Sequence, residues 1–149
     1  MRVENLKKQE SVVESVLFTM GQSVEIRQLA AALESDEETA IQAVERLKEK
    51  NRAWLLSSWQ VVVDRYPGLG EKIVVATWPY DFKLFYGYRN FALFGQDGER
   101  LAYANSIWAF IDTLTGHPTK IKEADVSAYG EDPKLEMDYA PRKVAVPKE

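Results

Sequence analysis

The feature that most constrains the fold is a change of pattern near residue 50. The chain has six Phe, four Trp and seven Tyr, and of these only Phe18 lies within residues 1–50. Up to Lys50 the apolar residues recur at the three- and four-residue spacing of amphipathic helices. From Arg52 the sequence "RAWLLSSWQVVVDRY" is typical of a β-strand. Because a single core seldom separates its aromatic residues so completely, the sequence predicts a helical part followed by a β part.

Residues 1–50 predict three amphipathic helices joined by short connections, as in a helix-turn-helix. Gly21 is expected to end the first helix, and Ser23 to cap the second. Ser35 is expected to open the third through a capping box with Glu38. The apolar residues expected to face inward are Val12, Val13, Val16, Leu17, Met20, Ile26, Leu29, Ala30, Leu33, Ala40, Ile41, Val44 and Leu47.

The third helix argues against DNA binding. It begins with Asp36, Glu37 and Glu38, where a recognition helix meets bases and phosphates, and carboxylates repel phosphates. The net charge of −4 gives no general attraction to nucleic acid or to an anionic membrane. We therefore favour a helical packing module over a nucleic-acid reader.

Four β-prone runs follow, each bounded by turn residues: "RAWLLSSWQVVVDRY", "EKIVVATW", "KLFYGYRNFALF" and "RLAYANSIWAFIDTLT". Asp97-Gly98 between the last two is a strong hairpin signal. Tight turns throughout, including one at residues 67–70, predict an antiparallel meander with its strands in chain order. Both faces of the fourth strand are mostly apolar, so we expect the sheet to be covered on both sides.

Composition excludes several kinds of chemistry. The absence of cysteine excludes a disulfide framework, a thiol nucleophile and Cys-based zinc sites. Because the chain also has only one histidine, it has few side chains that could anchor a metal ion. We therefore expect neither a metal nor a cofactor. No apolar run approaches the roughly 20 residues that span a bilayer. The charged start "MRVENLKKQE" does not resemble a signal peptide, so we expect a cytoplasmic protein.

The β part carries the motifs "WLLSSWQ", "TWPYDFK", "GYRNF", "LAYANSIWAFID" and "MDYAPRK". With them, about residues 47–146 resemble the first half of bacterial acyl-ACP thioesterases. The resemblance implies a HotDog domain, a curled antiparallel sheet around a central helix, which shapes the acyl pocket of a fatty-acid biosynthesis enzyme. We expect an α+β fold: an N-terminal three-helix, helix-turn-helix-like unit followed by a curled four-stranded antiparallel HotDog-like sheet. The third helix, residues 36–50, is expected to replace the central helix and lie across the sheet.

The helical part, "QESVVESVLFTMGQSVEIRQLAAALESDEETAIQAVERLKEK", resembles the start of ScpB, the bacterial chromosome segregation and condensation subunit. That resemblance covers about residues 9–50 and implies partners of the kleisin and SMC type. Together the two resemblances predict a ScpB-like segment over 1–50, a partial HotDog domain over 51–121, and a short helix with an extended linker over 122–149. A natural fusion, an engineered one and an assembly artefact remain open, as does a hybrid without function.

The candidate acyl-pocket residues are aromatic or polar positions within the strands. Acyl pockets are mostly apolar with few polar groups, although such residues serve equally well as the core of a sheet. Asn105 is polar within an apolar strand, so it either pins the sheet or faces the pocket. The candidates are Trp59, Trp78, Tyr88, Asn105 and Trp108.

Three basic residues are candidates for contact with an acidic acyl carrier protein. Arg89 either makes that contact or pairs with a buried carboxylate such as Asp112, which we favour. Arg142 and Lys143 either meet the carrier and its phosphopantetheine or belong to a solvated linker, which we favour.

We expect no catalytic residue in this chain. The thioesterase resemblance implies a catalytic Asn, His and Cys or Glu in a second HotDog domain, and His117, in the turn "TGHP", matches none of them. The expected behaviour is weak acyl binding without hydrolysis. Long edge strands and a poorly covered sheet face also predict a homodimer or aggregation.

Overall fold

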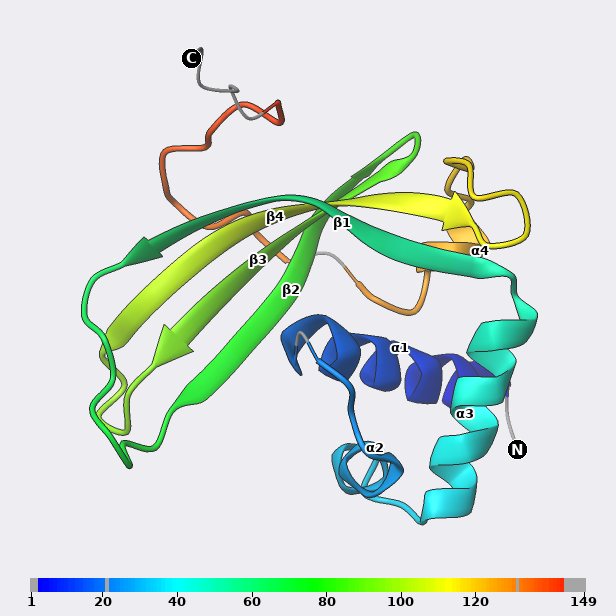
Figure 1. Cartoon of the computed structure of the whole chain (residues 1–149), viewed down its shortest axis with the longest axis horizontal. Helices are drawn as coiled ribbons and strands as arrows, with labels where there is room; N and C mark the ends of the chain where they lie inside the picture. Colours follow the sequence, from blue (N-terminus) through cyan, green and yellow to red (C-terminus); the bar gives the residue numbers. More distant parts are fainter. Residues whose placement is uncertain (1–2, 21, 131, 144–149) are drawn as a thin grey trace. The chain divides into compact units, whose positions relative to one another are not determined.

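The computed structural model describes residues 3–20, 22–130 and 132–143. The chain divides into two compact units (Figure 1). The helical unit comprises residues 1–53 with 112–117 and 122–130, and the sheet unit comprises residues 54–111 with 118–121 and 131–149. The α-helices are α1 (Val3–Met20), α2 (Ile26–Ala32), α3 (Glu37–Glu49) and α4 (Glu123–Val126), and the strands are β1 (Arg52–Val63), β2 (Val74–Lys83), β3 (Tyr86–Phe94) and β4 (Arg100–Asp112).

The three predicted N-terminal helices are confirmed. They enclose a small core of short and branched side chains, which lets the helix backbones approach one another. The buried residues of this core are Val13, Leu29, Ala30, Ala40 and Ala43, with Val16, Val24, Ile26, Leu33, Val44 and Leu47 packed against them. Leu17, Met20 and Ile41 were expected to face inward and are instead exposed.

Two predicted helix caps are wrong by one or two residues. Asp36 rather than Ser35 caps α3, and its side chain accepts a hydrogen bond of 2.8 Å from the Thr39 N–H. Glu25 rather than Ser23 caps α2, in a reciprocal arrangement with Gln28. In both cases an acidic residue one or two positions after the serine occupies the cap, near the positive end of the helix dipole. The predicted C-terminal glycine, Gly21, lies outside the described residues.

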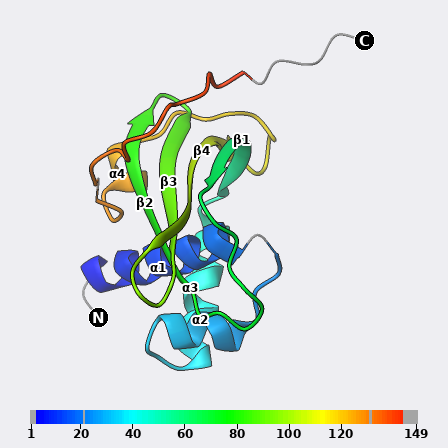
Figure 2. The same cartoon turned by 90° about the vertical axis from the view of Figure 1, so that its left-hand side faces the viewer.

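The sheet is a four-stranded antiparallel sheet, but the predicted order of its strands is wrong. The observed order is β1-β4-β3-β2, so β1 and β2 form opposite edges (Figure 2). Only β2–β3 and β3–β4 are hairpins. Residues 64–73, which include the Pro-Gly-rich stretch predicted to be a tight turn, instead cross to the other edge. The amides of Asp64 and Arg65 both donate to the Leu101 carbonyl at the start of β4.

The register of β2, β3 and β4 assigns each side chain to a face. Trp78, Asn90 and Asn105 lie side by side across the three strands. The face that they share with Tyr88 is called here the asparagine face. Residues at the alternate positions, among them Arg89 and its neighbours Phe91, Ala104, Ser106 and Trp108, lie on the opposite face. The register shifts between Pro79 and Asp81, so Tyr80 sits in a β-bulge.

One end of the sheet is tied by an ion-pair cluster around Arg65, which follows β1. Its guanidinium donates to both carboxylate oxygens of Glu71, at 2.7 and 3.0 Å, and its Nε donates to Glu99 at 2.8 Å. The Gly68 N–H adds a bond of 2.7 Å to Glu71. The Arg65 bonds, followed by that of Gly68, lower the pKa of Glu71 from 4.5 to about 2. The cluster joins the crossing connection to the β3–β4 turn.

This depressed pKa predicts a pH-dependent contribution of Glu71 to stability. The ionised carboxylate stabilises the folded state above about pH 4.5, and the effect is lost as the pH falls towards 2, where the folded protein protonates it. In urea unfolding, the difference in unfolding free energy between the wild type and Glu71→Gln should be constant above pH 5. It should shrink between pH 4.5 and 2. A difference that stays constant down to pH 2 would contradict this.

Candidate functional site

Asn90 is the polar centre of the asparagine face. Its side chain is fully buried in β3, and its Nδ2 donates to the Ala104 carbonyl of β4 at 3.2 Å. Its Oδ1 accepts the Leu135 N–H at 3.0 Å and lies 3.2 Å from the Tyr139 hydroxyl. Because a buried amide is costly unless it is hydrogen-bonded, these partners explain why an asparagine is tolerated in the middle of the sheet.

Asn105 is joined to a group of tyrosine rings. Its Oδ1 accepts a hydrogen bond of 2.8 Å from the hydroxyl of Tyr80, at the β2 bulge. The Tyr80 ring lies 5.9 Å from those of Tyr88 and Tyr139, tilted to the first and edge-on to the second. Burial, reinforced by Tyr139, Tyr88 and the negative charge of Asp81, raises the pKa of Tyr80 well above its usual value. The direction of the shift agrees with its role as the donor to Asn105.

Residues 132–142, called here the strap, lie over this face. At one end the Asp132 N–H donates to the Pro79 carbonyl at 3.2 Å, and the Trp78 indole N–H donates to the Pro133 carbonyl at 3.0 Å. Towards the other end, Gln60 of β1 donates to the Asp138 carbonyl at 2.7 Å and accepts the Ala140 N–H at 2.8 Å. The strap is thus anchored on both edge strands and, through Asn90, on β3.

Two cations of the strap lie over tyrosine rings. The Lys134 ammonium is 3.6 Å from the centre of the Tyr139 ring and 5.7 Å from that of Tyr80. The Arg142 guanidinium is 4.6 Å from the Tyr86 ring and donates to its hydroxyl at 3.1 Å. Such cation–π contacts add a modest attraction at exposed sites.

The opposite face also carries buried polar groups. Its polar groups form a chain: Arg89, only 5% exposed, donates to Thr77 at 3.0 Å, and its carbonyl accepts the Ser106 hydroxyl at 3.0 Å. The Ser106 oxygen in turn accepts the indole N–H of Trp108 at 2.7 Å. The Trp59 ring lies 5.4 Å from that of Phe91 and is 45% exposed.

Exposed apolar side chains follow Trp59 along β1 on the same face. Val61 and Val63, at alternate positions from Trp59, are both exposed, and Val75 is exposed on the other edge strand, β2. A run of exposed apolar side chains on one face, such as that of β1, is typical of a binding surface. This face can accommodate an apolar ligand or partner, whereas the asparagine face is already covered.

The sheet therefore separates the five predicted acyl-pocket residues. Trp78, Tyr88 and Asn105 lie on the asparagine face, and Trp59 and Trp108 lie on the opposite face. Sequence reasoning missed Asn90 and Gln60, which anchor the strap, and Tyr139 within it. The available signal was a polar residue inside the apolar strand "YGYRNFALF", the same signal that drew attention to Asn105.

The predicted basic residues have different surroundings. Burial of Arg89 favours its structural role, but Asp112, the carboxylate suggested as its partner, forms its ion pair with Arg52, at 2.6 Å. Arg142 and Lys143 are exposed, in keeping with either a carrier contact or a solvated segment.

His117 lies in an exposed turn after β4. Its carbonyl accepts the Asp112 N–H at 2.9 Å. The Asp112 carboxylate accepts the N–H groups of Thr115 and Leu114, and these bonds, together with Arg52, lower its pKa. The Asp112 carboxylate therefore stabilises the turn that contains His117. Within the part of the chain that the structure describes, no three His, Asp or Glu side chains are placed to hold a metal ion.

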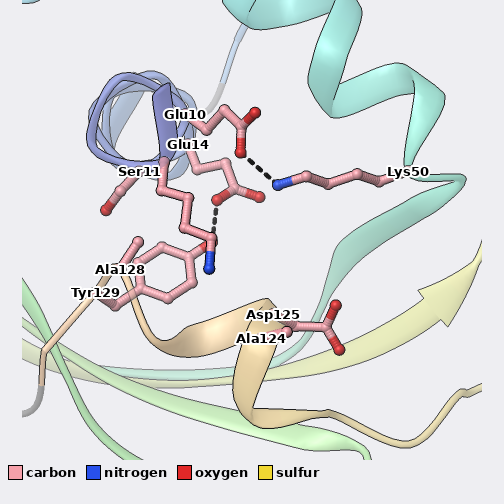
Figure 3. Close-up of a pocket in the computed structure, with 9 residues that line it drawn as sticks. Glu10, Ser11, Glu14, Lys50, Ala124, Asp125, Ala128 and Tyr129 are labelled. Carbon is pink, nitrogen blue, oxygen red and sulfur yellow. Dashed lines mark hydrogen bonds and ion pairs between the residues drawn. The ribbon is translucent and has the colours of Figure 1, made fainter. Parts of the chain in front are cut away.

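The helical unit contains a small polar cavity of about 20 Å³, with room for little more than a water molecule (Figure 3). Glu10, 6% exposed, accepts hydrogen bonds from Lys50 at 2.5 Å and from Arg46 at 3.3 Å. Glu14 accepts one from the Tyr129 hydroxyl. These internal partners make the cavity a joint between α1, α3 and the segment after α4 rather than an apolar ligand site. Its lining residues are Lys7, Glu10, Ser11, Glu14, Lys50, Ala124, Asp125, Ala128 and Tyr129.

Similar proteins were found by sequence. The palmitoyl-acyl carrier protein thioesterase of Gossypium hirsutum, a chloroplastic protein, is 34% identical over 82 residues, which cover 54% of this chain and 20% of that protein. The chain thus spans about a fifth of the length of that relative. None of the helices in the described residues is long and apolar enough to cross a membrane.

Solved structures share the fold. An acyl-ACP thioesterase from Bacteroides thetaiotaomicron superposes with a TM-score of 0.58 at 28% identity, over 73% of this chain and 48% of that one. A putative oleoyl thioesterase from Lactobacillus plantarum gives a TM-score of 0.59 at 22% identity, over 78% and 46% respectively. The four-stranded sheet preceded by helices is thus a HotDog-like thioesterase fold.

One protein family matches both the helical part and the β part of the sequence. The acyl-ACP thioesterase N-terminal domain matches residues 12–129, from within α1 to the segment after α4. These comparisons do not show a fusion with a ScpB-like segment, since one family covers most of the helices together with the sheet. Because the match spans most of the sequence, the chain belongs to the acyl-ACP thioesterase N-terminal domain family.

Proposed function

We propose that this chain is the acyl-binding part of an acyl-ACP thioesterase of fatty-acid biosynthesis. The observation that carries the proposal is the family match over residues 12–129 together with the exposed apolar surface on the sheet. A fatty acyl chain offers only apolar surface and one thioester, so it needs a surface with few polar groups.

Within this proposal, the acyl chain binds on the opposite face, at Trp59 and its aliphatic neighbours, with Trp108 further along. Arg89, Ser106 and Trp108 on that face make hydrogen bonds within the sheet, and no fully buried side-chain nitrogen or oxygen among the described residues lacks a partner. Trp78, Tyr88 and Asn105, on the asparagine face, contribute to the support of the sheet and strap instead.

The acyl carrier protein is the proposed partner. Carrier proteins present an acidic surface, and exposed basic side chains attract it at long range. Arg142 and Lys143 are the exposed candidates, whereas the buried Arg89 has little surface to offer. An interaction module for kleisin and SMC proteins is the alternative, and the family match does not favour it.

Catalysis requires groups that we do not assign to this chain. Thioester hydrolysis needs an activated nucleophile or water and donors for the developing oxyanion. Among the described residues the single histidine lies in an exposed turn, and the neighbouring carboxylate of Asp112 is bonded to that turn and to Arg52. The proposed activity of the chain alone is therefore binding, without hydrolysis.

Trp59→Ser should weaken binding of a fluorescent sixteen-carbon fatty acid by about tenfold. Burying a large apolar side chain is worth ~1.5–3 kcal/mol, and 1.4 kcal/mol is a factor of ten in affinity. Tyr66→Ser is the matched control, because this exposed aromatic residue lies in the crossing connection. Equal affinities for the wild type and both variants would place acyl binding elsewhere or exclude it.

Purified chain should hydrolyse palmitoyl-ACP no faster than buffer does, and His117→Ala should not change the rate. General-base assistance contributes roughly 10²–10⁴-fold, so an active histidine would be obvious in this assay. Hydrolysis well above background that disappears in His117→Ala would show that this domain carries a catalytic site of its own.

Immobilised acyl carrier protein should retain the chain at low salt and release it as salt rises, because the contact is electrostatic. Arg142→Glu combined with Lys143→Glu should abolish retention. The matched charge reversal Lys72→Glu combined with Lys120→Glu, at other exposed lysines, should reduce it less. Retention by immobilised kleisin but not by the carrier protein would support the alternative function.

A further inference from the structure

We propose that the strap, residues 132–142, is a releasable cover of the asparagine face, and that Asn90 and Gln60 are the positioning residues that hold it closed. The inference concerns the covered face and is independent of acyl binding on the opposite one.

The way in which the strap is attached supports release as a unit. A strand joins a sheet through a continuous backbone ladder, but the described residues of the strap form no strand. Most of their hydrogen bonds run from backbone groups of the strap to side chains of the sheet. Gln60 contributes two, Asn90 accepts that of Leu135, and Trp78 donates a fourth. Few side chains therefore decide whether the strap is docked.

The sheet beneath does not depend on the strap for its own pairing. The β2–β3 register runs from Val74↔Phe94 to Lys83↔Tyr86, and the β3–β4 register runs from Tyr86↔Ala109 to Phe94↔Arg100. The hydrogen bond from Asn90 to the Ala104 carbonyl does not involve the strap. The Tyr80–Asn105 hydrogen bond also lies wholly within the sheet. Local opening is therefore expected to need less free energy than global unfolding.

Release changes what the face presents. With the strap docked, Gln60 and the Oδ1 atom of Asn90 are engaged with strap backbone, and Tyr139 packs edge-on against Tyr80. When the strap is released, these amide groups and the rings of Tyr80 and Tyr88 become exposed to solvent. The face then presents hydrogen-bond donors, acceptors and aromatic edges. The strap is in this sense a lid, closed in the structure described here.

Trypsin offers a direct reporter, because Lys134 precedes the anchored Leu135 N–H. Cleavage of the Lys134–Leu135 bond, followed by mass spectrometry on the full chain, should be slow in the wild type. Gln60→Ala and Asn90→Ala should each accelerate it about three- to tenfold, the loss expected for one or two net hydrogen bonds. Gln96→Ala, in the exposed β3–β4 turn, is the control and should cleave at the wild-type rate.

Hydrogen exchange separates release from unfolding. The amides of Leu135 and Ala140 should exchange faster in both variants, while amides of β3 and β4 keep wild-type rates in Gln60→Ala, which leaves the buried core intact. If Asn90→Ala fails to fold, Gln60→Ala decides alone. The proposal is overturned if strap and sheet amides exchange at one common rate in the wild type, or if Gln60→Ala cleaves and exchanges like the wild type.

Discussion

The buried amide of Asn90 is the interaction on which much of the sheet unit depends. A single side chain in β3 bonds to the backbone of β4 on one side and to the strap on the other. Since an unsatisfied buried amide costs about 1–3 kcal/mol, the position of the strap and the choice of asparagine are mutually dependent. The alternation of side chains along the strands gives the sheet two different surfaces. One face carries both asparagines and is covered by the strap, and the other carries the exposed Trp59 and its aliphatic neighbours on β1.

This division explains how the chemistry is distributed. On the asparagine face the hydrogen-bonding groups are used internally, and burial raises the pKa of the Tyr80 hydroxyl. On the opposite face the polar atoms of Arg89, Ser106 and Trp108 bond to their neighbours and leave apolar surface around Trp59. This arrangement is consistent with the acyl-binding function proposed above.

Much of the fold could be predicted from the sequence, because local signals carried it. Helical spacing located α1 to α3, and Asp97-Gly98 located the β3–β4 hairpin. The strand order could not be predicted, because the Pro-Gly-rich residues 67–70 fit two connections equally well. They suit a tight turn into a neighbouring strand, and they also suit a longer connection that crosses to the other edge of the sheet. The split of the acyl candidates follows from the alternation of side chains along each strand together with the pairing register, which places Trp78 beside Asn90 and Asn105. The pairing of strands far apart in the sequence is not marked by any local signal. The anchoring roles of Asn90 and Gln60 depend on contacts with residues far along the chain.

The bulge and Pro79 interrupt edge strand β2 as a partner for a further β-strand. Along β2, one of the two edges, Pro79 has no N–H to donate, its carbonyl is taken by Asp132, and the bulge bends the strand at the next residue. A further strand pairing along β2 could not form its backbone hydrogen bonds at Pro79. The other edge, β1, runs from Arg52 to Val63 without a proline. Among the described strands the two borders of the sheet are thus unequal: β2 is interrupted as a pairing edge at Pro79, whereas β1 contains no proline.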